Sequence, residues 1–332
     1  MLKRIFKYST LIFLGILVSS CNDYKSIRES KEVVYFRLAE THPGDFPTTI
    51  ADREFARLVE EKTNGRIIIK VYDNESLGDE ASVIEQVQFG GIDFARVMIG
   101  RVAEFSPELN VLQLPYLYRD DEHMWKVLNS HIGDYFLKSI EDEGVIGLGW
   151  YGAGARNFYN SVKEINSLED FQGLRFRVVE SEMAKDMIRA LGASPVFIPY
   201  GKLYDALQIG EVDGAENNFP SYETSSHYKV AKYYTLDEHM RVPEILIASK
   251  KIMERITEED LEIIKECARQ TQLFQRELWR KKEKESKDKV YQAGCIITEI
   301  EDKEEFIKAV EPLYDKYAKD YMDIVKEIKE MR

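Results

Sequence analysis

The feature that most restricts the fold is an alternation of short apolar runs with helical patterns. Residues 33–38, 66–72 and 92–97 are rich in β-branched and aromatic residues, which favour strands. Between them, residues 50–59 and 80–89 carry apolar side chains at helical spacing. Strands that alternate with helices indicate crossover units and a largely parallel sheet, so the sequence predicts an α/β fold.

A second series of the same kind begins near residue 145. Strands are predicted at 145–150, 174–179 and 212–216, and the residues at 183–191 show a helical pattern between two of them. Two α/β series along one chain predict two lobes with a cleft between them. We recognise no internal repeat in the sequence.

The N-terminus has the three parts of an export signal: basic residues, an apolar run at 8–18, and small residues that lead to Cys21. The run is too short to cross a bilayer, which needs roughly 20 helical residues. The tetrad that ends at Cys21 resembles a lipoprotein box. We therefore predict a signal peptide at 1–20, a lipid on Cys21, a polar tether at 21–32 and an extracytoplasmic, membrane-anchored protein. The alternative is an ordinary secretory signal with an incidental cysteine.

The net charge excludes some partners. The chain carries −13, and the loss of residues 1–20, which hold three basic and no acidic residues, lowers this value by three. Such a body repels nucleic acid and gives no long-range attraction to an anion. If the protein binds an acid, a local cationic pocket must hold it.

No arrangement of residues indicates catalysis, a metal or a cofactor. The histidines form no HExxH pair, and the Gly-Ala-Gly at 152–154 lacks the third glycine of the dinucleotide fingerprint. No P-loop or nucleophile elbow is present. Cys267 and Cys295 allow one disulfide but do not require it. We therefore predict a binding protein rather than an enzyme, with no cofactor and no metal site.

Motifs in a fixed order extend over nearly the whole chain from residue 33. They lie at 77–78, 90–93, 112–116, 168–178, 191–195, 204–210, 212–218 and 249. Together they resemble the solute-binding subunits of tripartite ATP-independent periplasmic (TRAP) transporters, the DctP-type family. The resemblance implies a protein that captures a small organic acid and passes it to the TRAP membrane subunits.

The resemblance also implies the architecture. We expect a two-lobe periplasmic binding protein, type II-like, with the ligand cleft between the lobes and a long helix that spans both. The charged helical pattern from 257 to 289 is the candidate for this helix. The predicted division assigns 33–153 plus 243–282 to lobe I, and 154–242 plus 283–332 to lobe II.

Three residues map onto the family's carboxylate site. Arg177, on the strand after Gly173-Leu174, is the expected partner of the ligand carboxylate, and a guanidinium fork matches a carboxylate bidentately. Arg156 maps onto the family's second cleft arginine. Asn217 maps onto an asparagine that fixes the carboxylate or Arg177, since an amide can donate and accept.

Two further segments, 42–48 and 216–222, resemble the branch of the family that takes up hexuronates. In that branch sugar hydroxyls need paired donors and acceptors, which His42, Asp45, Asn218 and Glu244 are expected to supply. Four aromatic residues could pack against the sugar ring: Trp150, Tyr151, Tyr200 and Tyr222. Of these, we predict Tyr222 as a ligand contact.

Arg96 departs from the sialic-acid branch of the family, which has an acidic residue there. A third cation near the cleft suggests a ligand rich in oxygen acceptors, and the alternative for Arg96 is a salt bridge inside one lobe. D-glucuronate or D-galacturonate is the expected ligand. A C4-dicarboxylate or a 2-oxo acid, and an exported enzyme that acts on acidic sugars, remain as alternatives.

Overall fold

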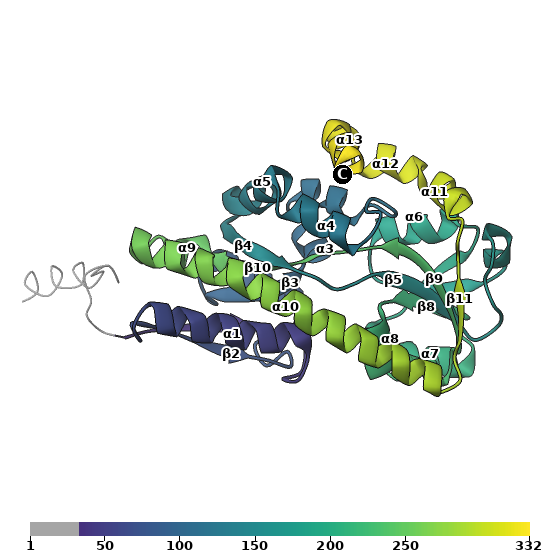
Figure 1. The fold of residues 1–332 in the computed structure, drawn as a ribbon, viewed down its shortest axis with the longest axis horizontal. Helices are drawn as coiled ribbons and strands as arrows, with labels where there is room; N and C mark the ends of the chain where they lie inside the picture. Colours follow the sequence, from purple (N-terminus) through teal and green to yellow (C-terminus); the bar gives the residue numbers. More distant parts are fainter. Residues whose placement is uncertain (1–32) are drawn as a thin grey trace, which may run out of the picture.

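The computed structural model describes residues 33–332 (Figure 1). The predicted signal peptide, Cys21 and the tether at 21–32 lie outside this part of the chain. Within it, no helix is both long enough and apolar enough to span a membrane.

The first sheet has the order β2-β1-β3-β10-β4. Its strands are β1 (Val34–Ala39), β2 (Ile67–Tyr72), β3 (Phe94–Met98), β4 (Val145–Tyr151) and β10 (Glu244–Ser249). Helices α1 (Pro47–Lys62) and α2 (Glu80–Phe89) connect β1, β2 and β3, so these strands run parallel, whereas β10 is antiparallel to both of its neighbours. We call the part of the protein built on this sheet the first lobe.

The second sheet has the order β11-β9-β5-β8-β6-β7. Its strands are β5 (Arg156–Asn160), β6 (Arg175–Val178), β7 (Ser194–Phe197), β8 (Gly214–Asn217), β9 (Tyr233–Met240) and β11 (Ile296–Glu299). Helices α6 (Glu182–Ala190) and α7 (Leu203–Ile209) connect β6, β7 and β8, and α8 (Phe219–Thr224) follows β8. The part built on this sheet is the second lobe, and its strand order confirms the predicted two-lobe α/β fold.

Helix α10 (Glu258–Gln292) crosses the whole molecule (Figure 1). Its 35 residues correspond to a length of roughly 50 Å at 1.5 Å per residue. The helix packs on α1 and β4 of the first lobe and on α8 of the second, and the Thr257 side chain caps its first turn. This is the long helix that the charged pattern from 257 predicts.

The C-terminal helices return from the second lobe to the first. They are α11 (Glu304–Val310), α12 (Pro312–Tyr317) and α13 (Met322–Glu330). Phe306 of α11 lies in a core cluster of the second lobe, whereas Ile328 of α13 packs in the main core of the first. The carbonyl of Ile328 also lies 2.8 Å from Nε2 of His123. The range 283–332, which the sequence assigns to lobe II, therefore includes a helix that packs on the other lobe.

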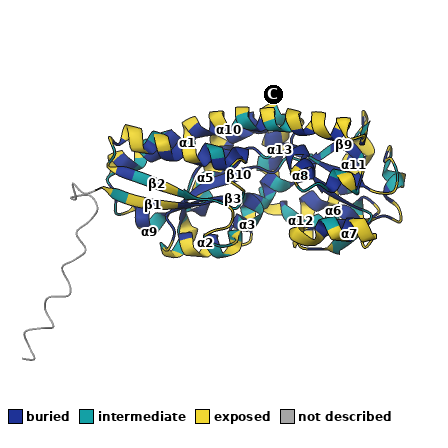
Figure 2. Ribbon diagram, turned by 90° about the horizontal axis from the view of Figure 1, so that it is seen from below, coloured by how far each residue is buried: buried dark blue, intermediate teal, exposed yellow. Residues whose placement is uncertain are grey.

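The remaining helices complete the first lobe. They are α3 (Ile99–Val102), α4 (Asp121–Leu128), α5 (His131–Ser139) and α9 (Lys250–Met253). In Figure 2 the two lobes lie side by side along α10, with buried residues concentrated at the sheets.

Short links bring the functional edges of the two sheets together. Residues 152–155 join the end of β4 to the start of β5, and residues 241–243 join the end of β9 to the start of β10. Because β1 and β3 also end at the edge where β10 begins, and β6 and β8 end where β5 begins, the carboxyl ends of the parallel strands in each lobe face the links. Ligands of open α/β sheets bind at such edges.

Candidate functional site

Arg177, at the end of β6, is a buried cation without a matching carboxylate. The residue is 4% exposed, its Nε donates to the carbonyl of Ile198 at 2.8 Å, and its guanidinium lies 5.8 Å from the ring centre of Tyr200. Within residues 33–332 its Nη groups make no other hydrogen bond or ion pair. Burial lowers the pKa of Arg177, but an arginine stays charged at neutral pH. The site therefore presents free, charge-bearing donors.

Several uncharged side chains lie near this guanidinium, and the charges of Glu216 and Arg156 also act on it. Nδ1 of His227 lies 2.8 Å from the hydroxyl of Tyr159, and burial together with the charge of Arg177 lowers the pKa of His227 to about 4. The exposed ring of Tyr200 packs against His227. His227 and Tyr159 were not predicted as site residues, because nothing in the sequence near either of them distinguishes it from a core residue.

Arg156, at the start of β5, is already paired. Its Nε and Nη2 donate to both carboxylate oxygens of Glu216 on β8, the second at 2.8 Å. Although burial opposes its ionisation, the charge of Arg156 and a contact with His239 lower the pKa of Glu216 to about 2. The second cleft arginine is therefore in place, but only its Nη1 is without a partner in residues 33–332.

His239 extends this ion pair. Its Nδ1 lies 2.8 Å from Oδ2 of Asp237, and its Nε2 lies 3.5 Å from Oε2 of Glu216. Burial disfavours the charged ring, but these two carboxylates raise the pKa of His239 to about 9. Around this ion pair, His239, Arg156 and the nearby Arg177 thus carry three positive charges against the two carboxylates of Glu216 and Asp237.

The two asparagines at the end of β8 have different environments. Oδ1 of Asn217 accepts from the backbone N–H of Asn218 at 2.9 Å, and its Nδ2 has no partner in the described chain. Oδ1 of Asn218 caps α8 at Ser221, and its Nδ2 donates to the carbonyl of Ala153 in the link between the lobes at 2.9 Å. Asn217 can serve a ligand, whereas Asn218 joins the second lobe to the link.

Tyr222 differs from its expected place. Its side chain is fully buried in a core cluster of the second lobe, and its hydroxyl donates to the carbonyl of Ala231 at 2.5 Å. It therefore presents no face to the cleft. Trp150 and Tyr151 are also buried, and Tyr200 is the one exposed aromatic residue of the four proposed for the wall.

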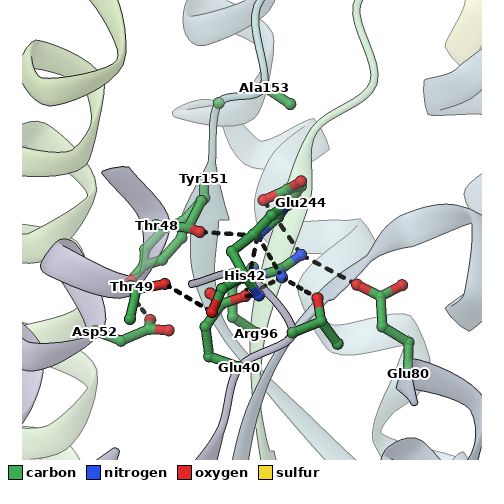
Figure 3. A network of polar contacts seen from close by, with 12 residues as sticks. Glu40, His42, Thr48, Thr49, Asp52, Glu80, Arg96, Tyr151, Ala153 and Glu244 are labelled. Carbon is green, nitrogen blue, oxygen red and sulfur yellow. Dashed lines mark hydrogen bonds and ion pairs between the residues drawn. The ribbon is translucent and has the colours of Figure 1, made fainter. Parts of the chain in front are cut away.

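Arg96 on β3 lies at the centre of an ion-pair network in the first lobe (Figure 3). Its side chain has no exposed surface, and its Nε donates to Glu40 at 2.9 Å and its Nη1 to Glu80 at 3.1 Å. Nη1 also lies 3.5 Å from Glu244. Burial opposes the charge of Arg96, but these carboxylates raise its pKa. The structure thus shows the salt bridge inside one lobe that the sequence leaves as the alternative.

His42 stands at the edge of the same network. Its Nδ1 lies 2.8 Å from Nη2 of Arg96 and 3.0 Å from Oε1 of Glu40, and its ring stacks on Phe46 at 4.1 Å. The side chain is 30% exposed, and Nε2 has no partner among the described residues. This nitrogen can therefore bind a ligand. The neighbouring Asp45 is exposed, and its side chain makes no hydrogen bond or ion pair in the same part of the chain.

Two more carboxyl groups complete the first-lobe face. Oε2 of Glu244 is buried and has no hydrogen-bond partner within residues 33–332. The hydroxyl of Tyr151 donates to Asp52 at 2.9 Å, and burial followed by the charge of Glu40 raises the pKa of Asp52 well above its usual range (Figure 3). Asp52 and Glu40 were not predicted as site residues, because in the sequence each resembles an ordinary polar residue of a helix or a strand end.

The two faces have opposite charge. The second lobe carries an excess cation at Arg177, whereas the first lobe sets three carboxylates against the guanidinium of Arg96. A carboxylate fits the second face, and hydroxyl donors fit the first. Among the described residues, no group of three His, Cys, Asp or Glu side chains is arranged to hold a metal ion.

The comparisons with known proteins agree with this geometry. Residues 38–320 match the model of the DctP family, described as bacterial extracellular solute-binding protein, family 7. The chain belongs to this family. A solute-binding protein of Chromohalobacter salexigens is 36% identical over 311 residues, which cover 94% of this chain and 91% of that protein.

Solved structures of family members are also similar. A TRAP periplasmic solute-binding protein from Bradyrhizobium, in complex with α/β-D-galacturonate, has 38% identity and a TM-score of 0.84, covering 90% of this chain and all of that one. Another, from Chromohalobacter salexigens with bound D-glucuronate, has 36% identity and a TM-score of 0.85, covering 89% and 99%. These findings confirm the predicted resemblance to TRAP solute-binding proteins, and the protein is an extracytoplasmic binding protein.

Proposed function

We propose that this chain is the solute-binding subunit of a TRAP transporter and that its ligand is a hexuronate, D-glucuronate or D-galacturonate. The observation that carries the proposal is the buried guanidinium of Arg177, whose Nη groups are free within the described residues while the facing lobe is acidic. The similar structures with bound galacturonate and glucuronate support the choice of ligand.

Capture follows from the geometry of the second lobe. The ligand carboxylate accepts two hydrogen bonds from the Nη groups of Arg177, with Nδ2 of Asn217 and Nη1 of Arg156 as further donors. The links at 152–155 and 241–243 then act as hinges that bring the first lobe over the sugar. Closure excludes water, which strengthens the ion pair.

The first lobe selects against a second carboxylate. His42 and Glu244 offer hydrogen-bonding groups for hydroxyls, whereas Glu40 has no exposed side-chain surface and matches the charge of Arg96. A C4-dicarboxylate would place its second anion against these carboxylates, and like charges in a closed cleft repel strongly. A monocarboxylate with several hydroxyls is therefore the better ligand than succinate or another C4-dicarboxylate.

Calorimetric titration of the purified protein tests the ligand. We expect tight binding of D-glucuronate or D-galacturonate, and weak or no binding of succinate and of sialic acid. Tight binding of succinate with no binding of either hexuronate would overturn the proposal.

We also propose that the protein binds its ligand without converting it. The family consists of solute-binding proteins, and no carboxylate here stands free as a catalytic base beside Arg177 within residues 33–332. Incubation with a methyl glucuronide, followed by chromatography, should return the uronide unchanged. A new product that depends on the protein would establish an enzyme.

The lipid anchor at Cys21 is a separate proposal that rests on the sequence pattern alone. Mass spectrometry of the mature protein from membranes tests it. A diacylglyceryl group on Cys21 is expected, and an unmodified mature N-terminus elsewhere would contradict it.

A further inference from the structure

The two lobes repeat one topology. The order β2-β1-β3-β10-β4 of the first sheet corresponds to β7-β6-β8-β5-β9 of the second. In each lobe the central strand leads through a helix to the outer strand, and a second helix leads back to the strand on its other side. Helices α2 and α7 are therefore equivalent elements, although the sequence shows no recognisable repeat.

The equivalence holds at the level of single hydrogen bonds. The backbone N–H of Arg37 donates to Asp93 at 2.7 Å, and the backbone N–H of Arg175 donates to Asp213 at 2.8 Å. In each lobe the residue after this arginine pairs in register with the residue after this aspartate. Each arginine also donates from Nη2 to a carbonyl in the turn that follows the helix.

The ends of α2 and α7 are built in the same way. Each helix is followed by a left-handed glycine, Gly90 with φ 78° and Gly210 with φ 72°. The residue after the glycine donates its N–H to the carbonyl five residues before it, at 2.7 Å and 2.9 Å. This hydrogen bond closes a Schellman motif and fixes the last helical side chain in each lobe.

That last side chain is apolar and exposed in both lobes. Phe89 is 76% exposed and Ile209 is 75% exposed, the two highest values among the large apolar side chains of the described residues. One turn earlier on each helix stands an exposed acid, Glu85 before Phe89 and Asp205 before Ile209. A single exposed apolar residue is common on protein surfaces. An acidic and an apolar residue at equivalent positions of both lobes instead indicate a shared function.

We propose that Phe89 and Ile209 form a two-point docking surface for the membrane subunits of the transporter. This inference rests on the proposed function. In Figure 2, α10 lies along the upper edge, while α2 and α7 lie at the lower edge, one in each lobe. The helices that carry the two side chains therefore lie on the side of the molecule away from the long helix, one in each lobe.

The position of each contact is tied to the ligand site. Helix α2 runs directly into β3, which carries Arg96, and α7 runs into β8, which carries Glu216 and Asn217. When the lobes close on a ligand, the distance between Phe89 and Ile209 changes with them. A partner that accepts both side chains at one fixed spacing thus distinguishes the closed, loaded protein from the open one.

The chemistry of the surface defines the partner. Each apolar side chain fits a small hydrophobic pocket, and Glu85 and Asp205 call for a lysine or arginine at the rim of that pocket. Two such pockets suit a membrane transporter, because transporters of this kind are commonly built from repeated halves. The occupant is therefore a membrane protein with two basic-rimmed apolar pockets on its extracytoplasmic face.

The experiment compares the wild-type protein with Phe89→Ser, Ile209→Ser and the double variant. Binding of each to the cognate TRAP membrane subunits in nanodiscs is measured by biolayer interferometry, with and without D-glucuronate, and glucuronate affinity is measured by calorimetry. Tyr35→Ser is the matched control, because Tyr35 is 72% exposed on β1 and the equivalent position of the second lobe is Gly173, which has no side chain.

We expect each single change to weaken binding to the membrane subunits about tenfold and the double change about a hundredfold, with unchanged affinity for glucuronate. Tyr35→Ser should bind as the wild type does. The inference is overturned if the double variant binds within about twofold of the wild type, if Tyr35→Ser loses as much, or if the wild type does not bind the subunits at all. Failure of the proposed ligand is visible separately, as absent glucuronate binding by the wild-type protein.

Discussion

Arg96 on β3 and Glu216 on β8 occupy equivalent positions in the two lobes, each three residues after the aspartate that anchors its strand. Both side chains are buried, and each is the centre of the ion-pair network of its lobe. Three carboxylates surround Arg96, whereas Arg156 and His239 contact Glu216, so equivalent positions give the first lobe an acidic face and the second lobe a basic one. The two faces of the cleft thus carry opposite charge although the two lobes share one topology.

Arg177→Lys should weaken hexuronate binding by roughly 10- to 100-fold, because an ammonium group cannot donate two parallel hydrogen bonds to a carboxylate. This loss corresponds to about 1.5–3 kcal/mol. The matched control is Arg175→Lys, two residues earlier on the same strand, where the side chain is exposed and paired with Asp213. Calorimetry should show near wild-type affinity for the control, and affinity of Arg177→Lys within about twofold of the wild type would refute the assignment.

Arg96→Met should destabilise the protein. The change leaves Glu40, Glu80 and Glu244 buried without their guanidinium, and such a loss costs about 3–5 kcal/mol. Arg101→Met removes an exposed arginine from an i,i+3 pair with Glu104 and should cost less than about 0.5 kcal/mol. Denaturant unfolding at pH 7 measures both. If Arg96→Met lowers the free energy of unfolding by less than about 1 kcal/mol, then Arg96 does not stabilise the carboxylates of the first-lobe network.

The pH dependence of stability should reveal His239. Its pKa is raised to about 9 in the folded protein, against about 6.5 when unfolded, because the carboxylates of Asp237 and Glu216 outweigh its burial. The native state therefore holds the extra proton, and its contribution, roughly 3 kcal/mol, is fully present below pH 6.5 and is lost as the pH rises through 9. His239→Gln should remove this slope from unfolding curves recorded between pH 6.5 and 9.5.

His227→Gln serves as the contrasting variant. The pKa of His227 is lowered to about 4 by burial and by Arg177, so its contribution is present above pH 6.5 and is lost as the pH falls towards 4. This variant should change the acid side of the stability profile and leave the slope above pH 6.5 as in the wild type. An unchanged alkaline slope in His239→Gln would mean that His239 does not hold the extra proton.

The sequence predicted what local patterns determine. The strands of both series, the long helix from 257 and the position of Arg177 at the end of a strand all follow from periodicity and motif spacing. The environment of Arg96 does not, because Glu40 and Glu244 reach it from strands that are distant in the chain. Tyr222 illustrates the same limit, since an aromatic residue near a strand end packs in a core or in a cleft according to the fold.

The repeat of the two lobes was also hidden from the sequence. The helix end, the glycine turn, the aspartate and the arginine that binds it recur, and these few residues are too short a match to recognise without the structure. The packing of the C-terminal helix α13 on the first lobe was not predicted either, for a related reason. Helix α13 is amphipathic, and amphipathicity shows which face is buried but not which lobe buries it.

Gly154→Ala tests the link between the lobes. Gly154 has φ 66°, and a Cβ there would lie 2.6 Å from Nε1 of Trp279 and 2.8 Å from Oε1 of Glu283, both on α10. Gly173 has φ 81° with open space around it, so Gly173→Ala should show the cost of the left-handed conformation alone, about 1–2 kcal/mol. Gly154→Ala should cost about 1–3 kcal/mol more, because the link must move away from the helix.

The same displacement should reach the ligand. The neighbouring carbonyl of Ala153 accepts from Asn218, so a shift of the link moves the end of β8 and with it Asn217. Calorimetry should therefore show weaker hexuronate binding by Gly154→Ala and wild-type affinity for Gly173→Ala. If the two alanine variants lose equal stability and keep equal affinity, then α10 does not hold the link in place, and closure must pivot at residues 241–243 alone.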